Sequence, residues 1–509
     1  MIRRALGLIA ATAMLWATVG EAADIRVGFT QDALTLDPGN HRSRETETII
    51  RQMYDGLFTR NSRMEVVPEL VDTWQQIDPL TYEFTIHRGV RFHSGDELTA
   101  EDIKFTFDRL SRENAMGGQT SPRQSLLGPL SEVRVTGPYT VRFVLREPWP
   151  ILTAMLPFQE VVSRGFVERV GTEGMATQAN GTGAFRLVEW RRGDSLILER
   201  FNDYFGGARS IPPVGPARVD RVIVRVIPEN AARVAALLSG SVELINELPA
   251  SAIRQVEANP NTRVARVNGT RTFFIAFNNA RPPFNDSRVR RALNHAIDRN
   301  LIIQRILAGA AVPLNGVMSP DAFAFNRDLP EFRYDPELAR RLLAEAGHAN
   351  GFEATIDTQS AYREISEAIA SMLNRVGLRI RVQVWEGSVL TPIWQNAERR
   401  RERDMFFTSW GNGALDPSDI MVPTLRTNGR GNSAGYSNAE VDRLLDGAET
   451  EVDTNKRRDM YMRAQLLVNQ DAPWLFLWLP QDLYGVSRRL EGWEPNADSR
   501  INLQRATLR

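Results

Sequence analysis

Residues Trp74–Leu110, WQQIDPLTYEFTIHRGVRFHSGDELTAEDIKFTFDRL, contain a predicted strand, a turn and a predicted helix in succession. Within this stretch, Thr81–Ile86 alternates polar and apolar side chains, which predicts a β-strand. Thr99 then begins a helix, because its side chain can cap the first turn and Asp102 can reach back to it, a variant of the capping box. Strand, turn and helix in this order indicate a mixed α/β fold.

The remainder of the chain continues the same alternation of strands and helices. Two further strands are predicted by their alternating pattern, at Asp24–Phe29 and Thr140–Leu145. Helices are predicted at Ser287–Arg299, between Asp335-Pro336 and Gly347, at Val441–Ala448 after a capping box at Ser437–Glu440, and at Asp453–Asn469. The sequence contains no internal repeat and no low-complexity tract, so an interleaved α/β architecture is expected.

The composition excludes several classes of function. Lys plus Arg and Asp plus Glu both number 62 among the 509 residues, and this balance argues against a nucleic-acid partner. The absence of cysteine excludes disulfides, thiolate metal sites, thiol nucleophiles and a lipid-modified N-terminal cysteine. The five histidines show no metal-ligand spacing, and no nucleophile–base motif of a hydrolase is present. We therefore expect no catalytic residue, no protein-built metal site and no cofactor.

The N-terminal residues 1–23 have the pattern of a cleaved export signal. Arg3 and Arg4 provide a positive start, Ala5–Val19 is uncharged and largely apolar, and Gly20–Ala22 supplies small residues for cleavage. The apolar run is shorter than the ~20 residues that span a bilayer. We predict cleavage after Ala22 or Ala23 and an exported mature protein of nearly neutral charge.

Two other motifs are interpreted as structural. Gly181-Thr182-Gly183 lacks the spacing of a nucleotide-binding loop and is typical of a tight turn. The carboxylates Glu243 and Glu247 are attributed to a helix or loop surface.

Four segments, taken together in their order and spacing, resemble a known protein family. They are Trp74–Leu110, Gly181–Phe185 with Val188–Trp190, Phe277-Asn278 with Pro283–Arg299, and Thr408–Gly411 with Asp416-Pro417 and Tyr436–Asn438. The chain is similar to the peptide/nickel class of solute-binding proteins, family 5, which serve ABC importers.

The resemblance implies a two-lobed periplasmic binding protein fold of the α/β class, with an extra subdomain in the first lobe and a two-strand hinge. The first lobe is expected at residues 24–270, with the subdomain at about 55–180. The second lobe is expected at residues 271–480, and the C-terminal residues 481–509 are expected to return to the first lobe. The crossing strands are expected near Arg271–Phe277 and Leu477–Tyr484.

The function implied by the resemblance is that of a periplasmic receptor. It would capture a peptide or peptide-like solute, such as a dipeptide, an oligopeptide, glutathione or an amino-acid conjugate. It would then deliver this solute, as a monomer, to the permease subunits of an inner-membrane importer driven by a cytoplasmic ATPase. An opine, a sugar or a metal chelate remains an alternative ligand, and a sensor or an exported hydrolase remains an alternative function.

Four places are candidates for ligand contact, because the cleft of such a receptor needs a few polar groups and an aromatic wall. They are the loop Thr30-Gln31-Asp32, the residue Asn278, the residue Arg363 as a carboxylate partner, and the segment Trp410-Gly411-Asn412 as a strand partner for the ligand.

The chain departs from the family pattern at Gly413. Peptide binders of this family commonly have an Asp there, which pairs with the ligand's α-amine, and Asp416 or Asp419 could replace it. Glutathione, γ-linked peptides and opine-like conjugates therefore become stronger candidates than ordinary peptides.

Overall fold

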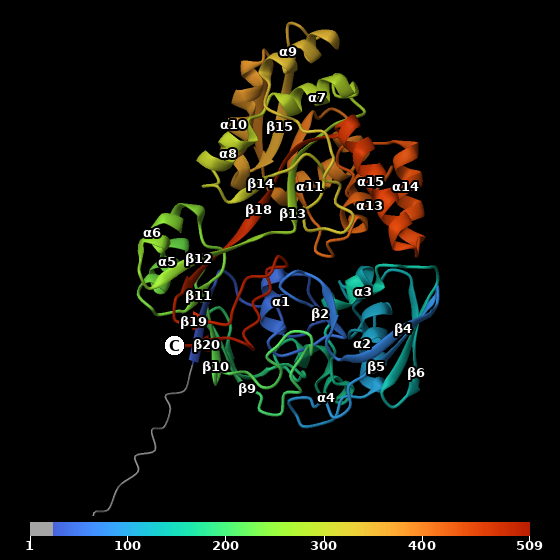
Figure 1. The fold of residues 1–509 in the computed structure, drawn as a ribbon, viewed down its shortest axis with the longest axis vertical. Coiled ribbons are helices and arrows are strands. Elements are labelled where there is room, and N and C mark those ends of the chain that lie inside the picture. Colours follow the sequence, from blue (N-terminus) through green and yellow to red (C-terminus); the bar gives the residue numbers. More distant parts are fainter. Residues whose placement is uncertain (1–23) are drawn as a thin grey trace, which may run out of the picture.

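The computed structural model of this chain describes residues 24–509, so the predicted signal peptide at 1–23 lies outside the described residues. The chain folds into two lobes, which lie one above the other in Figure 1. They are joined at one side by β12 (Thr262–Asn268), β13 (Arg271–Phe277) and β18 (Trp474–Ser487). The predicted two-lobed α/β architecture is confirmed.

The longest strand, β18 (Trp474–Ser487), belongs to both lobes. Its first residues pair with β13 (Arg271–Phe277) in the second lobe, and its last residues pair with β12 (Thr262–Asn268) in the first. Its sequence, WLFLWLPQDLYGVS, has two buried apolar halves around a partly exposed Pro-Gln-Asp centre. The polar centre lies where the strand leaves one core and enters the other, as expected for a hinge strand.

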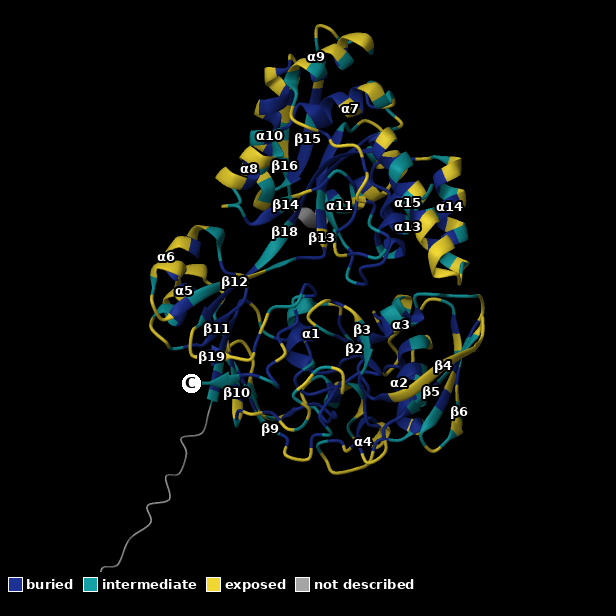
Figure 2. Ribbon diagram, in the orientation of Figure 1, coloured by how far each residue is buried: buried dark blue, intermediate teal, exposed yellow. Residues whose placement is uncertain are grey.

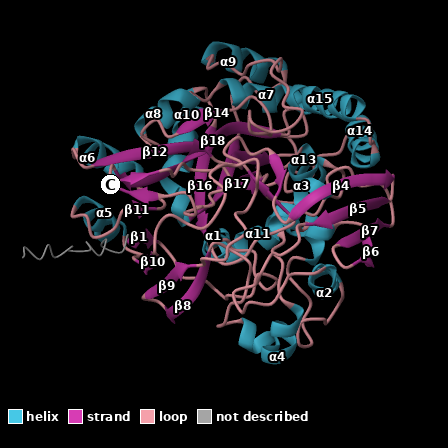
Figure 3. Ribbon diagram, turned by 60° about the horizontal axis from the view of Figure 1, so that its bottom comes forward, coloured by secondary structure: helices cyan, strands magenta, loops and turns pink. Residues whose placement is uncertain are grey.

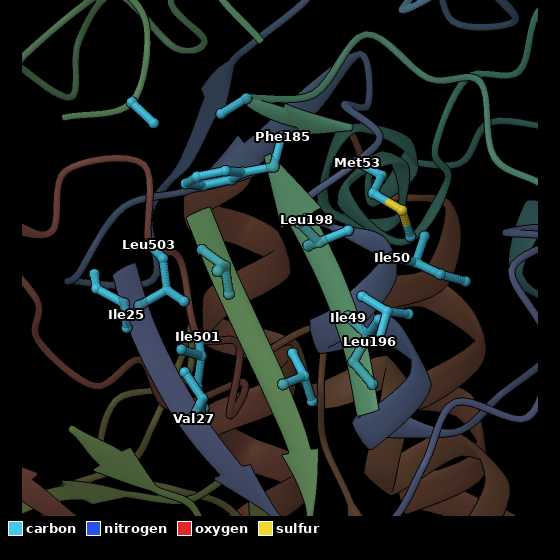
Figure 4. Close-up of a cluster of buried hydrophobic side chains, with 14 of the residues drawn as sticks. Ile25, Val27, Ile49, Ile50, Met53, Phe185, Leu196, Leu198, Ile501 and Leu503 are labelled. Carbon is cyan, nitrogen blue, oxygen red and sulfur yellow. The ribbon is translucent and has the colours of Figure 1, made fainter. Parts of the chain in front are cut away.

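The first lobe is built on a sheet with the strand order β8-β9-β10-β1-β11-β18. Its strands are β1 (Asp24–Phe29), β8 (Phe185–Arg191), β9 (Ser195–Arg200), β10 (Arg221–Val226) and β11 (Leu244–Ile245). Its helices are α1 (Arg44–Ile50), α4 (Arg164–Met175), α5 (Asn230–Leu238) and α6 (Ile253–Ala258). The C-terminal tail returns to this lobe, where Ile501 and Leu503 join Ile25 and Val27 in one hydrophobic core (Figure 4).

A second sheet, ordered β4-β5-β7-β6, forms a subdomain of the first lobe with its own core (Figure 3). Its elements are β4 (Val71–Asp78), β5 (Thr81–Ile86), α2 (Ala100–Ser111), β6 (Leu130–Gly137), β7 (Thr140–Leu145) and α3 (Leu152–Met155). The hairpin β2 (Phe58–Arg60) and β3 (Val66–Pro68) lies beside it.

The second lobe packs helices on both faces of the sheet β16-β15-β17-β13-β18. Along β13, Phe274 and Ala276 enter one core, while Ile275 and Phe277 enter the other, as strand alternation requires. The strands are β14 (Ala311–Pro313), β15 (Glu353–Gln359), β16 (Arg379–Trp385) and β17 (Met405–Gly411). The helices are α7 (Ser287–His295), α8 (Arg299–Arg305), α9 (Pro336–Glu345), α10 (Arg363–Arg375), α11 (Gly387–Gln395), α12 (Ala397–Arg400), α13 (Pro417–Leu425), α14 (Ala439–Thr450) and α15 (Thr454–Asp471). The buried strands and the exposed outer helix surfaces are visible in Figure 2.

Most local predictions are confirmed, including the bounds of β1, β5 and β7 and the capping box at Thr99 and Asp102. The single helix predicted at Ser287–Arg299 is wrong. It ends at His295, and Asp298 caps a new helix by accepting the backbone N–H of Leu301.

The predicted capping box at Ser437–Glu440 is also wrong. Asn438 caps α14 by accepting the backbone N–H groups of Glu440 and Val441, and the Glu440 side chain pairs with Arg463 instead.

The Gly181-Thr182-Gly183 turn is structural, as predicted. A Cβ atom on Gly181 would lie 2.1 Å from the Met53 carbonyl oxygen, and a Cβ on Gly183 would lie 2.4 Å from the Met53 carbonyl carbon. The Thr182 hydroxyl donates to buried Asp55 at 2.8 Å. The glycines therefore permit a close approach of two backbone segments.

Replacing Gly181 by Ala is expected to destabilise the protein by about 3 kcal/mol, because the added methyl group overlaps backbone atoms that cannot move aside. Gly165→Ala is the matched control, since Gly165 lies in α4 with open space around it and should gain ~0.5–1 kcal/mol. Urea unfolding of the two variants measures both effects. Equal stability of the two variants would remove the close-approach explanation.

Candidate functional site

A cavity of about 520 Å³ lies beside the crossing strands, at the hinge between the lobes. Its wall brings together the start of α1, the segment after β11, the first residue of β13, the polar centre of β18 and the C-terminal tail. The charged residues that line it are Arg42, Arg44, Glu45, Glu247, Arg271 and Asp482. The cavity therefore carries charges of both signs.

Arg44 and Asp482 form the centre of this site. Arg44 Nη1 lies 3.6 Å from Asp482 Oδ2 and donates to the Ser499 hydroxyl at 2.7 Å, while Nη2 donates to the Thr270 hydroxyl at 3.2 Å. The Ser499 hydroxyl in turn donates to Asp482. This network ties α1, β18 and the tail together next to the cavity.

Arg271 has no comparable partner. Its Nη1 donates to the Ser409 hydroxyl at 3.3 Å, and in the described part of the chain no carboxylate oxygen lies within 4 Å of its guanidinium nitrogens. Burial lowers the pKa of Arg271, and the neighbouring Arg44 guanidinium lowers it further. A half-paired guanidinium in a cavity wall is suited to bind a carboxylate from a ligand.

Two carboxylates of the cavity, Glu247 and Asp482, have pKa values above those of free carboxyl groups. Burial raises the pKa of Glu247, and the nearby Glu45 raises it further. Burial also raises the pKa of Asp482, although Arg44 partly offsets this effect. These carboxylates would gain stability from a cation such as an ammonium group.

The family model of bacterial extracellular solute-binding proteins, family 5 (middle region), matches residues 65–432. This chain belongs to that family.

Relatives and solved structures cover nearly the whole of this family 5 chain. The glutathione-binding protein GsiB of Pectobacterium atrosepticum is 26% identical over 97% of this chain and 96% of its own length. HbpA2 of Haemophilus parasuis superimposes with a TM-score of 0.87 at 22% identity, covering 96% of this chain and 100% of the other. DppA of Helicobacter pylori, solved with the peptide STSA, gives 0.77 at 24% identity, covering 96% and 98%. These likenesses support the two-lobed binding-protein fold with an inserted subdomain and a two-strand hinge.

The loop Thr30-Gln31-Asp32 follows β1 and forms its contacts within the first lobe. The backbone N–H of Thr30 donates to Asn246 Oδ1 at 3.1 Å, and Gln31 is exposed. The Asp32 carboxylate accepts the Trp190 indole N–H at 3.0 Å and the Gly193 backbone N–H at 2.7 Å. Asp32 therefore fixes the β8–β9 turn, and none of the three residues lines the cavity.

Asn278 lies at the end of β13 that is remote from the cavity. It follows Arg271 by seven positions, which corresponds to about 23 Å of extended chain. Its side-chain amide donates to the carbonyl oxygens of Arg400 and Arg403, and its residue is almost fully buried. These contacts give Asn278 a role in packing the second lobe.

Arg363 begins α10, just after the end of β15, and its side chain is largely exposed. Its Nε pairs with Glu367 Oε1 at 2.8 Å, one helical turn away. Arg363 does not line the cavity.

The segment Trp410-Gly411-Asn412 does lie beside the cavity wall. Gly411 is opposite Arg271 in the β13–β17 ladder, and the Asn412 backbone N–H donates to the Thr270 carbonyl at 2.8 Å. The Trp410 indole donates to the Asp419 carbonyl at 2.9 Å, and the Arg430 guanidinium lies 5.0 Å from the centre of the Trp410 ring. The structure therefore brings this segment together with Arg271.

Asp416 and Asp419 have different surroundings. Asp416 is buried and accepts two hydrogen bonds from Arg457, both at 2.7 Å, so its charge is fully paired. Asp419 is only half-buried, and burial raises the pKa of its carboxyl group while Arg430 and Arg42 lower it. Of the two, Asp419 has the carboxylate available to a ligand.

The glycine at position 413 also has a structural reason. A Cβ atom there would lie 3.3 Å from the ring of Phe158, which belongs to the first lobe. Nearby, Arg60 Nη2 donates to the Ala414 carbonyl at 3.1 Å, a direct contact between the lobes. The larger Asp side chain would crowd this contact.

Sequence reasoning missed the charged residues of the cavity. The surface interpretation is wrong for Glu243, which is buried and pairs with Arg26. It is confirmed for Glu247, which is exposed in the loop after β11, where it also lines the cavity. Asp482 could have been singled out as a candidate from the sequence, because it is the one charged residue in the otherwise largely apolar β18. The contact of Arg44 with Asp482 joins positions too far apart in sequence to show a pattern.

Within residues 24–509, none of the helices is both long enough and apolar enough to span a bilayer.

We expect Asp416→Asn to destabilise the protein by ~3–5 kcal/mol, because it leaves the buried Arg457 guanidinium without its counter-charge. Asp419→Asn is the matched control and should change stability by less than ~1 kcal/mol, since burial already disfavours the charged form and an amide oxygen can still accept the Ala414 N–H. Denaturant unfolding measures both variants. A larger loss at Asp419 would reverse the two assignments.

Proposed function

We propose that this protein is the periplasmic receptor of an ABC importer for a peptide-like solute that carries both a carboxylate and an ammonium group. The observation that carries the proposal is the hinge cavity, where the half-paired Arg271 guanidinium faces the same space as Glu247 and Asp482. The glutathione-binding relatives at 26% identity support a ligand of this kind.

In the proposed site, Arg271 binds a ligand carboxylate, because a guanidinium can form two parallel hydrogen bonds with that group. Glu247 and Asp482 bind the ammonium group, whose positive charge favours the ionised form of both carboxylates. The backbone of Trp410-Gly411-Asn412 lies along the ligand, and Asp419 serves a second amine in longer ligands.

Thr30 and Gln31 remain predictions as ligand contacts, and a more closed form would have to bring them to the cavity. Arg363 and Arg271 are alternative partners for the ligand carboxylate, and the variants described below distinguish them. Asp32, Asn278 and Asp416 are left out of the proposed site, because their polar atoms already bond to other parts of the protein.

The proposed mechanism is capture followed by closure. The ligand would contact Arg44 on the first lobe and Arg271 at the start of the second lobe's β13, so binding favours the closed arrangement. Bending at the Gly269–Arg271 connection and at the centre of β18 would allow this movement. The closed monomer is then recognised by the inner-membrane permease, and the cytoplasmic ATPase supplies the energy.

The direct test is calorimetric titration of the mature protein with glutathione, combined with small-angle X-ray scattering before and after saturation. The proposal predicts one binding site, a smaller radius of gyration on binding, and recovery of the ligand unchanged. Binding of a sugar or a metal chelate in preference to every peptide-like probe would overturn the ligand class. Hydrolysis of the ligand would overturn the receptor assignment.

Arg271→Gln is expected to weaken glutathione binding by about 2–3 kcal/mol, or roughly 30- to 150-fold, because the ligand carboxylate loses its charged partner. Arg363→Gln serves as the comparison, since Arg363 is exposed and paired with Glu367. Its affinity should stay within about twofold of the wild type. A greater loss of affinity in Arg363→Gln than in Arg271→Gln would assign the ligand carboxylate to Arg363 on α10 instead.

The affinity is expected to fall as the pH is lowered from 7 to 5. Because burial raises the pKa of Glu247 and of Asp482, these groups begin to take up protons at a higher pH than free carboxylates, and the neutral forms no longer attract an ammonium group. Titrations at both pH values measure the effect. In Glu247→Gln the dependence should be smaller, whereas an unchanged slope would exclude Glu247 as an ammonium partner.

A further inference from the structure

A second cavity, of about 690 Å³, lies in the first lobe and shares no lining residue with the hinge cavity. It is bordered by the β2–β3 hairpin, by the ends of β12 and β18, and by the C-terminal tail. Its volume is within the range of small-molecule sites in proteins, ~300–1,000 Å³. The function proposed above does not use this cavity.

The lining of this cavity is strongly basic. It contains the five arginines Arg60, Arg263, Arg488, Arg500 and Arg505, against the two acids Glu491 and Glu494. Among the described residues only Arg500 of these five forms an ion pair, with Glu47 at 2.7 Å and Asp498 at 3.5 Å. Glu491 is already paired with Arg509 at 3.2 Å. The lining residues of the cavity therefore include more positive than negative charges.

Four N–H donors of the lining are also buried without an acceptor in the described structure. They are Nε of Arg60, Nε1 of Trp493, Nη1 of Arg500 and Nε of Arg505. The residues Arg60, Trp493 and Arg500 are only 6%, 2% and 7% exposed. A buried donor without an acceptor destabilises the folded protein, and native structures normally provide a partner for such a group.

We propose that this cavity binds a small solute bearing an oxyanion, either a carboxylate or a phosphate, through Arg60, Trp493, Arg500 and Arg505. Oxyanions accept hydrogen bonds from guanidinium and indole N–H groups and neutralise the positive charge in the same step. Water could satisfy the four donors, but it would leave the charge of the unpaired arginines uncompensated.

The position of Arg60 supports this assignment. Its Nη1 donates to the carbonyl oxygen of Met64, and its Nη2 donates to those of Ala154 and Ala414. These carbonyl groups carry no full negative charge. Burial lowers the pKa of Arg60 to about 10, so the group still carries its charge at neutral pH. Its Nε has no acceptor in the described structure.

The test uses the mature wild-type protein with sodium phosphate and with sodium citrate as probes, each against sodium chloride at equal ionic strength. Calorimetric titration and the thermal unfolding midpoint are recorded. We expect saturable binding of at least one oxyanion, with a higher unfolding midpoint, and no effect of chloride. Preference for phosphate or for citrate identifies the oxyanion. The absence of saturable binding for both would mean that water alone satisfies these donors and would overturn the proposal.

The double variant Arg488→Gln/Arg505→Gln locates the site. Neither arginine forms an ion pair among the described residues, so the variant should fold, and oxyanion affinity should fall at least tenfold. Arg489→Gln is the matched control, because Arg489 is exposed and lies outside the lining. Arg271→Gln should retain oxyanion binding, since it alters only the hinge cavity. Loss of binding in Arg271→Gln, or full binding in the double variant, would place the anion elsewhere and refute this site.

Discussion

The feature on which the rest of this structure depends is a single strand that serves two hydrophobic cores. The 14 residues of β18 span ~46 Å at the usual rise of about 3.3 Å per residue, enough to cross from one lobe to the other. Each half is apolar and buried because it completes a sheet. The three residues between the halves belong to neither core, and one of them, Asp482, carries a charge. The hinge and the charged cavity thus have a common origin.

The cavity then follows from what gathers around Asp482. Arg44 from α1 and Ser499 from the tail bond to it, and this contact fixes the first lobe against the crossing strand. Arg271, at the start of the other crossing strand, is brought near Arg44 and gains no carboxylate of its own within 4 Å in the described structure. A ligand carboxylate would supply the counter-charge that Arg271 lacks. Because both crossing strands contribute to the binding of the ligand, closure of the lobes would follow.

The sequence predicted those parts of the fold that depend on neighbouring residues. The alternation in Thr81–Ile86 and the side chains of Thr99 and Asp102 determine local structure directly, and these elements are confirmed. The helix break at Asp298 was missed because the apolar pattern continues across it.

The candidate site was predicted less well. Of the residues named from the sequence, Trp410-Gly411-Asn412 lies beside Arg271, whereas Asn278 and Asp32 are bonded elsewhere. Contacts such as Arg44 with Asp482 join the two ends of the chain and leave no periodic signal. Such contacts form only in the folded chain, where the C-terminal tail lies against α1.

Native mass spectrometry of the protein purified from the periplasm tests the central claim most directly, because a closed binding protein can retain its ligand. The account predicts an additional mass that is released on denaturation and has the composition of a peptide or amino-acid conjugate with a free carboxylate and a free amine. A released sugar, or any solute without a carboxylate, would contradict the assignment of Arg271 and with it the proposed chemistry of the hinge cavity.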